Sequence, residues 1–212
     1  MNKTITVCTI IFLNVFFSIG CATTDSQNYS TEMIADVDPI TLGEVEIQFN
    51  KIFSSKLDSG TAEIVFEPRE NRVFLQFRYQ FVTYRQYWDA QNRGKFSAAV
   101  ERFNREFEES TLVDRGTKTR KNYGSFKGLT EWQQFNIGIA FPFRSHPTFQ
   151  LGYEFKEKIP YLTILQQDAP DETRTNDEVQ ARSLVIIVYL TRSQAKEVNA
   201  FFDQNFLKAQ VQ

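Results

Sequence analysis

The sequence predicts an α+β domain in which two helices pack on one antiparallel sheet of about six to seven strands. Three observations support this fold class: repeated alternation of apolar and polar residues, two stretches with helical spacing, and 21 Phe among 212 residues. Alternation with period two is typical of antiparallel strands that have one face in water. Abundant aromatic residues suit a sheet-rich core. The expected order is three strands, a helix, three or four strands, and a helix.

The first half of the predicted domain is a three-stranded meander followed by a helix. Period-two patterns run over residues 45–49, 62–67 and 72–81, and they are separated by Ser59-Gly60 and by a turn at 68–71. The spacing then becomes helical. The apolar stripe of this helix is Phe96, Val100, Phe103 and Phe107. We expect the helix to begin between residues 89 and 95.

The second half contains a long polar loop or hairpin over residues 110–128, then more strands and a last helix. The expected strands lie at 135–143, 149–155, 160–166 and 183–190, with an acidic segment at 168–180 before the last one. Because that last strand is apolar on both faces, we expect it to be central. Thr191-Arg-Ser-Gln194 fits a capping box that opens the C-terminal helix. Its inward residues are expected to be Ala195, Val198, Phe202 and Phe206.

The first twenty-one residues have the layout of a secretory signal. Lys3 is their one charged residue, residues 5–19 are mostly apolar, and small residues follow before Cys21. The apolar run is interrupted by Asn14 and is shorter than the about 20 residues that span a bilayer. The segment therefore predicts export rather than a membrane-spanning helix.

Ser18-Ile19-Gly20-Cys21 resembles the lipobox of bacterial lipoproteins, although Ser18 stands where that family usually has Leu. The resemblance covers residues 1–21 alone, and no family is recognised for the rest of the chain. It implies that the Cys21 thiol receives a diacylglycerol and that cleavage before Cys21 frees an amine for a further acyl chain. No other cofactor is expected. The second cysteine, Cys8, lies in the segment that would be removed.

The resulting organisation is a signal peptide at 1–20, a lipidated Cys21 with a flexible tether at 21–40, and a single domain at 41–212. Acylation also explains why an exported chain keeps one unpaired cysteine. The expected location is the cell envelope of a bacterium, with the lipid in a bilayer, at the periplasmic or surface face of the outer membrane. The residue after the cysteine, Ala22, is compatible with outer-membrane sorting in that family.

Composition and motifs argue against several kinds of chemistry. The net charge of −2 gives no general attraction to nucleic acid, and export argues against it independently. His146 is the only histidine, and it precedes Pro147 in what reads as an exposed turn. A zinc cluster of soft ligands cannot be assembled from one histidine and an acylated cysteine. No metal site and no catalytic residues are therefore expected.

Two surfaces are candidate binding sites. The first is a basic segment without acids, whose candidate residues are Arg115, Lys118, Arg120, Lys121, Tyr123 and Lys127. It can meet phosphates, sulfated glycans or acidic loops, and the alternative is a solvated hairpin. The second is an aromatic cluster over residues 79–88, whose candidate residues are Tyr84, Tyr87 and Trp88. It can form a binding platform, and the alternative is core packing.

These observations favour a non-catalytic lipoprotein that acts as a binding or structural module for an unknown protein or glycan partner. Two alternatives remain at this level. A curved sheet covered by a helix can enclose an apolar ligand, so the chain can be a carrier. The third reading is a metal-independent enzyme that uses carboxylates together with the basic segment.

Overall fold

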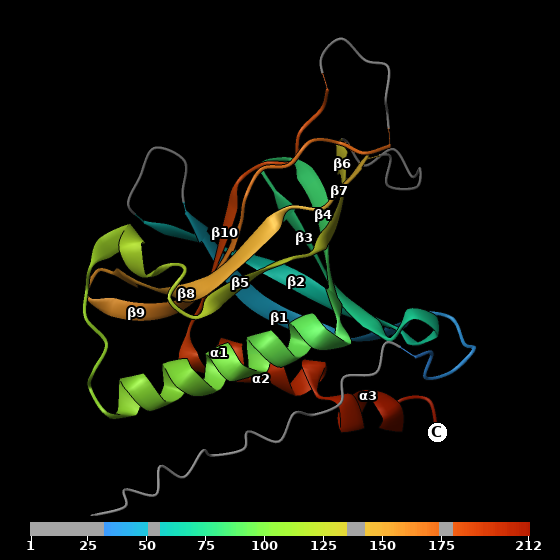
Figure 1. Cartoon of the computed structure of the whole chain (residues 1–212), viewed down its shortest axis with the longest axis horizontal. Coiled ribbons are helices and arrows are strands. Elements are labelled where there is room, and N and C mark those ends of the chain that lie inside the picture. The colour runs from blue at the N-terminus through green and yellow to red at the C-terminus, as the bar shows by residue number, and fades with distance from the viewer. Residues whose placement is uncertain (1–31, 51–55, 135–142, 174–179) are drawn as a thin grey trace, which may run out of the picture.

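The computed structural model describes residues 32–50, 56–134, 143–173 and 180–212 (Figure 1). These residues form ten strands, three α-helices and two short 3-10 helices. The elements of the first half are β1 (Ile40–Asn50), β2 (Leu57–Glu67), η1 (Pro68–Glu70), β3 (Arg72–Tyr79), β4 (Val82–Asp89) and α1 (Ala90–Glu108). Those of the second half are η2 (Gly116–Thr119), β5 (Gly124–Lys127), β6 (Leu129–Gln134), β7 (Phe143–Ser145), β8 (Thr148–Lys156), β9 (Ile159–Gln166), β10 (Ile186–Leu190), α2 (Arg192–Phe202) and α3 (Gln204–Ala209).

All strand pairs of the sheet are antiparallel, and the strand order is β5-β8-β9-β10-β1-β2-β3-β4-β6-β7. The two ends of this order are halves of one long bent hairpin. β5 continues into β6 through Gly128, and β7 continues into β8 through His146-Pro147. One half of the hairpin pairs with β9 and the other half pairs with β4. The sheet therefore curls round so that its two ends meet in the same hairpin.

Gly128 and Pro147 explain where the hairpin bends. A Cβ atom at Gly128 would lie 2.7 Å from the Phe149 ring, so a larger residue does not fit there. Proline has no N–H to donate to a ladder. The Gly128 N–H still donates to Pro147 O at 3.2 Å, which keeps the register of the two halves continuous across the bend.

The core lies between the helices and the sheet face that they cover, which we call the inner face (Figure 1). Trp88 of β4 is fully buried at its centre. The rings of Phe96 from α1 and Phe202 from α2 lie 5.5 and 5.3 Å from it, and those of Phe126 and Phe149 lie 5.1 and 5.8 Å away. Aromatic rings at these separations attract one another and fill the interior.

The fold class is confirmed as an antiparallel sheet with helices, but the predicted number and order of strands are wrong. The expected third strand over 72–81 ends at Tyr79, and residues 82–89 form β4 rather than the approach to a helix. The turn between them is Gln80-Phe81, which contains none of the Gly, Asn, Asp or Pro residues that mark a hairpin in a sequence. β5 likewise lies inside the predicted loop at 110–128, and most of the strand predicted at 135–143 lies outside the described residues.

The C-terminal helix is broken, although its predicted start is confirmed. Thr191 and Gln194 form the capping box. The helix stops at Asp203, whose side chain accepts from the N–H groups of Asn205 and Phe206 and opens α3. The break changes the helical register, so Phe206, expected inward, is exposed and Leu207 is buried instead.

The end of the predicted tether contacts the domain. The Ile34 N–H donates to Pro68 O at 2.9 Å, and Arg69 pairs with Asp36 and Asp38. The proposed signal and Cys21 lie outside the described residues. None of the helices described is long and apolar enough to cross a membrane.

Candidate functional site

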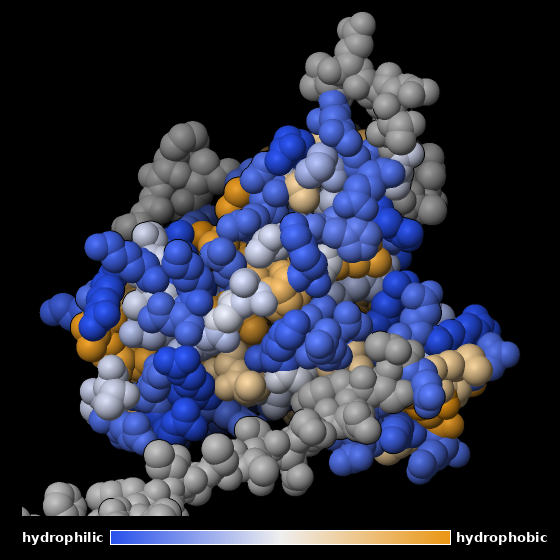
Figure 2. Space-filling view, viewed as in Figure 1, coloured by the Kyte–Doolittle hydropathy of each residue, from blue (hydrophilic) through white to orange (hydrophobic). Residues whose placement is uncertain are grey.

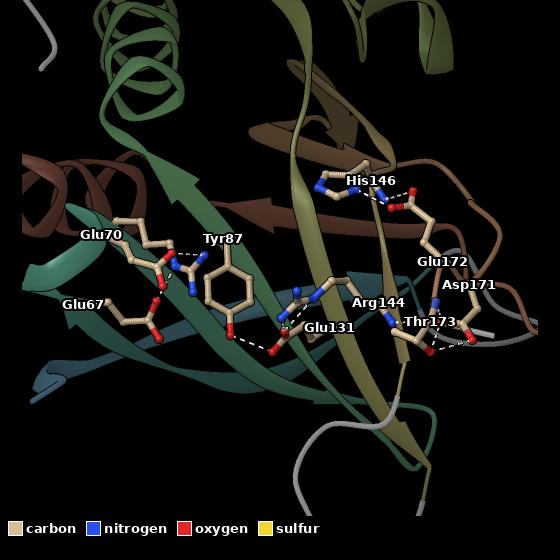
Figure 3. Close-up of polar contacts among 10 residues, drawn as sticks. Glu67, Glu70, Tyr87, Glu131, Arg144, His146, Asp171, Glu172 and Thr173 are labelled. Carbon is tan, nitrogen blue, oxygen red and sulfur yellow. Dashed lines mark hydrogen bonds and ion pairs between the residues drawn. The ribbon is translucent and has the colours of Figure 1, made fainter. Parts of the chain in front are cut away.

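A chain of polar contacts crosses the sheet face away from the helices, which we call the outer face (Figure 3). Glu131 of β6 is its centre. It accepts a hydrogen bond from Tyr87 Oη at 2.8 Å and hydrogen bonds from Arg144 at 3.0 and 2.5 Å. Burial, followed by the bond to Glu131, raises the pKa of Tyr87, and the same carboxylate raises the pKa of Arg144. The contacts therefore favour a neutral Tyr87 and a charged Arg144.

The chain of contacts extends over an apolar row on the same face. Val65, Phe74 and Tyr87 are buried together there, with Leu129 against them. The guanidinium of Arg72 lies 4.4 Å from the centroid of the Tyr87 ring and pairs with Glu67 and Glu70. A cation over a ring in this geometry is attracted by the electron-rich face of the ring. The arginine thus covers the apolar row instead of leaving it open.

Beyond Arg144 the contacts reach the segment after β9 (Figure 3). Asp171 is fully buried, and its Oδ1 accepts hydrogen bonds from the backbone N–H groups of Arg144 and Thr173 at 3.1 Å each. His146 is exposed, and its Nδ1 lies 2.7 Å from Glu172 Oε2. These contacts hold residues 171–173 beside β7. The histidine is exposed as the sequence predicts, but it lies at the bend between β7 and β8 rather than in a turn.

A depression of about 470 Å³ lies next to this chain of contacts, and we call it the outer-face groove. Its lining residues are Glu44, Thr61, Glu63, Gln76, Phe77, Arg78, Thr83, Arg85 and Gln133. Gln76 donates to Glu63 at 3.0 Å, and Arg85 donates to Gln76 at 2.8 Å. Charged and amide side chains therefore line a continuous polar surface across several strands.

One arginine of the predicted basic segment belongs to a different network, which we call the covered network: Arg120, Glu154, Lys156 and Tyr189. Arg120 Nε and Nη2 lie 2.5 and 3.0 Å from the two carboxylate oxygens of Glu154. Lys156 Nζ also lies 3.0 Å from Glu154, and Tyr189 donates to it at 2.8 Å. Burial alone would raise the pKa of Glu154, but these donors outweigh it and the net pKa is lowered. The guanidinium of Arg120 is therefore paired within the domain and contributes to its structure.

The other residues of that segment are divided between surface and structure. Arg115, Lys118 and Lys121 are exposed. Tyr123 is half-buried and donates to Glu106 at 2.7 Å, while the Lys127 amine is exposed and donates to His146 O at 3.4 Å. The segment is therefore a smaller positive patch than its sequence predicts.

The predicted aromatic platform is buried. Tyr84 and Trp88 point into the core, and Tyr87 belongs to the apolar row on the outer face. Burial raises the pKa of Tyr84 to about 12. The core-packing alternative is the arrangement that the structure has. Phe81, another aromatic residue of the same cluster, is exposed.

The described residues contain no group of three or more His, Cys, Asp or Glu side chains placed to hold a metal ion. Figure 2 shows a face that is mostly hydrophilic, with apolar side chains in small separate groups. The interior is filled by the rings around Trp88, and this packing gives the apolar-carrier alternative no support.

Sequence reasoning missed the roles of Glu131, Arg144, Asp171 and Arg78, and it placed Phe81 only within the aromatic cluster. The first three depend on partners on other strands, which no local pattern reveals. Arg78 has a usable signal, because period-two alternation from Val73 already assigns it to the face in water.

The described residues form one curled antiparallel sheet, with helices packed on its inner face and polar side chains across its outer face. The chain belongs to the family described as "Uncharacterised Treponema protein", which matches residues 39–209. The predicted domain, for which the sequence alone suggested no family, is thus covered by one.

A protein of Treponema pallidum (strain Nichols), described as an uncharacterized protein, is 22% identical over 192 residues, which is 90% of this chain. The chain spans 65% of the length of that relative. No solved structure matches the chain.

Proposed function

We propose that the protein is a bacterial envelope lipoprotein, anchored through acyl chains on Cys21, whose domain is a non-catalytic module that binds another macromolecule. The lipobox-like residues 18–21 support the anchor, and the bacterial genus of the family and of the relative agrees with it. Two or three acyl chains, at about 0.8 kcal/mol per buried methylene, make such attachment effectively stable.

The direction of the pKa shifts is the observation that carries the non-catalytic part. A carboxyl group that acts as a general acid at neutral pH needs a raised pKa, and a tyrosine that acts as a base or nucleophile needs a lowered one. Here the pKa values of Glu106 and Glu154 are lowered by hydrogen bonds that outweigh their burial. Those of Tyr87, Tyr123 and Tyr189 are raised, first by burial. These environments keep the two glutamates ionised and the three tyrosines neutral. Side chains with such fixed ionisation states suit recognition.

The outer-face groove is the binding surface that we propose for this module. It combines two arginines, two glutamates, two glutamines and two threonines within one depression. Such a lining offers both donors and acceptors along an extended path, as recognition of a polar chain requires. The partner is a protein or a glycan of the envelope or of a host.

The anchor is tested by replacing each cysteine in turn and following labelled palmitate in cells. Cys21→Ser is expected to abolish the label and to move the protein out of the membrane pool that the lipid holds. Cys8→Ser, in the segment expected to be removed, is the matched control and should keep both. Label that persists in Cys21→Ser would refute the lipid anchor.

The groove is tested separately on purified protein with isolated cell-wall sacculi and with an envelope protein array. Thr83→Trp fills the groove from a half-buried strand position, whereas Lys196→Trp places the same ring on the exposed side of α2. Binding that only Thr83→Trp weakens supports the groove. Equal effects of the two variants, or turnover of a cell-wall substrate, would contradict the proposal.

A further inference from the structure

The tip of the β3–β4 hairpin carries a side chain that local structure does not favour. Tyr79 pairs with Val82, so Gln80 and Phe81 form a two-residue turn with φ of 49° and 66°. Turns of this kind favour Asn or Gly, because a larger side chain is crowded at positive φ. The Phe81 side chain is nevertheless 78% exposed, the highest value among the exposed large hydrophobic residues of the described chain. Burial of the ring therefore does little to offset the unfavourable backbone conformation.

Arg78 lies beside this ring with its charge available. Its guanidinium is 5.7 Å from the centroid of the Phe81 ring. Arg72, Arg120 and Arg144 each pair with a carboxylate. No acid among the described residues forms such a pair with Arg78. The tip thus presents a cation and an apolar ring next to each other in water.

Aromatic packing and strand pairing hold the hairpin tip in place. The Tyr79 ring lies 5.2 Å from that of Phe49, and Phe49 lies 5.4 Å from Phe77, which is buried in the core. Strand pairing continues up to the turn, through Arg78 with Thr83. A surface fixed before binding loses less conformational entropy when a partner arrives.

Arg78 also lies between two depressions in the protein surface. It lines the outer-face groove and a second depression of about 250 Å³, which includes Asp58, Ser59 and Gln80. Both hollows are at the end of β3 away from η1 and from residues 32–39. Eight residues of strand separate the two ends, which is roughly 26 Å. In Figure 1, β3 and β4 extend away from η1 and the helices.

We propose that Arg78 and Phe81 form a recognition tip for a protein partner that presents a carboxylate beside an apolar pocket. Arginine and aromatic side chains dominate the energetically important centres of protein interfaces. A guanidinium binds a carboxylate strongly, and the neighbouring ring fills an apolar pocket. A protein is favoured over the anchoring bilayer because the tip is at the end away from the segment that leads to Cys21. The inference rests on the domain being a binding module, but it does not require lipid on Cys21.

Selection of random twelve-residue peptides on the purified full-length protein in detergent tests the chemistry of the tip. Peptides that carry Asp or Glu next to large apolar residues are expected to be enriched, and the affinity of a synthesised winner should fall at least tenfold in Arg78→Ala and in Phe81→Gly. Arg115→Ala, an exposed arginine of the basic segment, is the matched control and should bind as the parent does. Enrichment without an acid, or binding that survives both tip variants, would overturn the proposal.

Two further measurements separate binding from structure and protein from lipid. Phe81→Gly is expected to unfold at the same temperature as the parent or at a higher one, because glycine relieves the positive φ. A clear loss of thermal stability would show that Phe81 has a structural role and would contradict the proposal. In vesicles of brominated phosphatidylcholine, the added fluorescence of Phe81→Trp should remain unquenched. Quenching would assign the tip to the bilayer instead.

Discussion

Arg120 and Arg78 are both attached to the same sheet, yet their surroundings are opposite. Arg120 lies in the covered network, where it shares a buried carboxylate with Lys156 and Tyr189. Arg78 stands at the hairpin tip beside an exposed ring, with no such pair among the described residues. The difference shows that the fold decides which basic residues already have a carboxylate partner within the domain. The richest cluster of positive charge in the sequence therefore loses Arg120 to an internal ion pair, while Arg115, Lys118 and Lys121 stay exposed.

The largest loss of stability is expected where residues 116–120 pack over β8, beside the covered network. Segment 116–120 crosses β8 so tightly that a Cβ at Gly152 would lie 2.1 Å from Thr119 O. Gly152→Ala should therefore lower the free energy of unfolding by about 3 kcal/mol, as measured by urea denaturation. Gly116→Ala is a control with a φ of +59° and no atom within 4 Å of the added Cβ. It should cost about 1 kcal/mol. Equal losses would mean that the crossing is not tight.

The two arginines themselves give the next contrast. Arg120→Ala leaves Glu154 buried with Lys156 and Tyr189 alone, and it should lower the free energy of unfolding by about 2–3 kcal/mol. Arg78→Ala removes an exposed side chain and should change it by less than about 0.5 kcal/mol. Urea denaturation of both variants measures the difference. Similar values would remove the contrast between the two sites.

The covered network should also make stability depend on pH. Since the pKa of Glu154 is lower in the folded chain than its ordinary value of 4.5, the unfolded chain binds the proton more tightly. The free energy of unfolding should then fall as the pH drops below about 4.5 and through the folded pKa. Thermal melts between pH 3 and pH 7 should show a shallower dependence in Glu154→Gln. An unchanged slope would show that another acid is responsible.

A smaller loss than that in Arg120→Ala is expected at the edge of the basic segment. Tyr123→Phe removes the hydrogen bond to the half-buried Glu106 and should cost about 1 kcal/mol. The same urea titration measures it. A loss as large as that in Arg120→Ala would place Tyr123 in the buried structure rather than at its margin.

The parts of this fold that local chemistry determines were predictable. Thr191 and Gln194 cap the last helix through bonds within four residues. β10 is central, between β9 and β1, because its apolar residues need cover on both faces. The β3–β4 turn gave no signal, since Gln80 and Phe81 adopt a conformation that other residues prefer. β4 was missed for that reason, and β5 was missed because it lies in the polar segment expected to be a loop or hairpin.

The partners of charged residues were not predictable for a different reason. Arg120 meets Glu154 and Arg144 meets Glu131 only after separate strands have paired. Asp171 looks like one member of a solvated acidic segment, but backbone donors from Arg144 and Thr173 bury it. A sequence shows which residues carry charge. The fold decides which of those charges are already neutralised.

The position of β1 has a consequence for how the chain would fold after the export that we propose. β1 pairs with β10, so the first strand is completed by one that is made nearly 140 residues later. The sheet can close only when residues near the C-terminus are available on the same side of the membrane as β1. A chain that crosses as an extended polypeptide benefits from this arrangement, because its early segments alone cannot form the finished domain and block the passage.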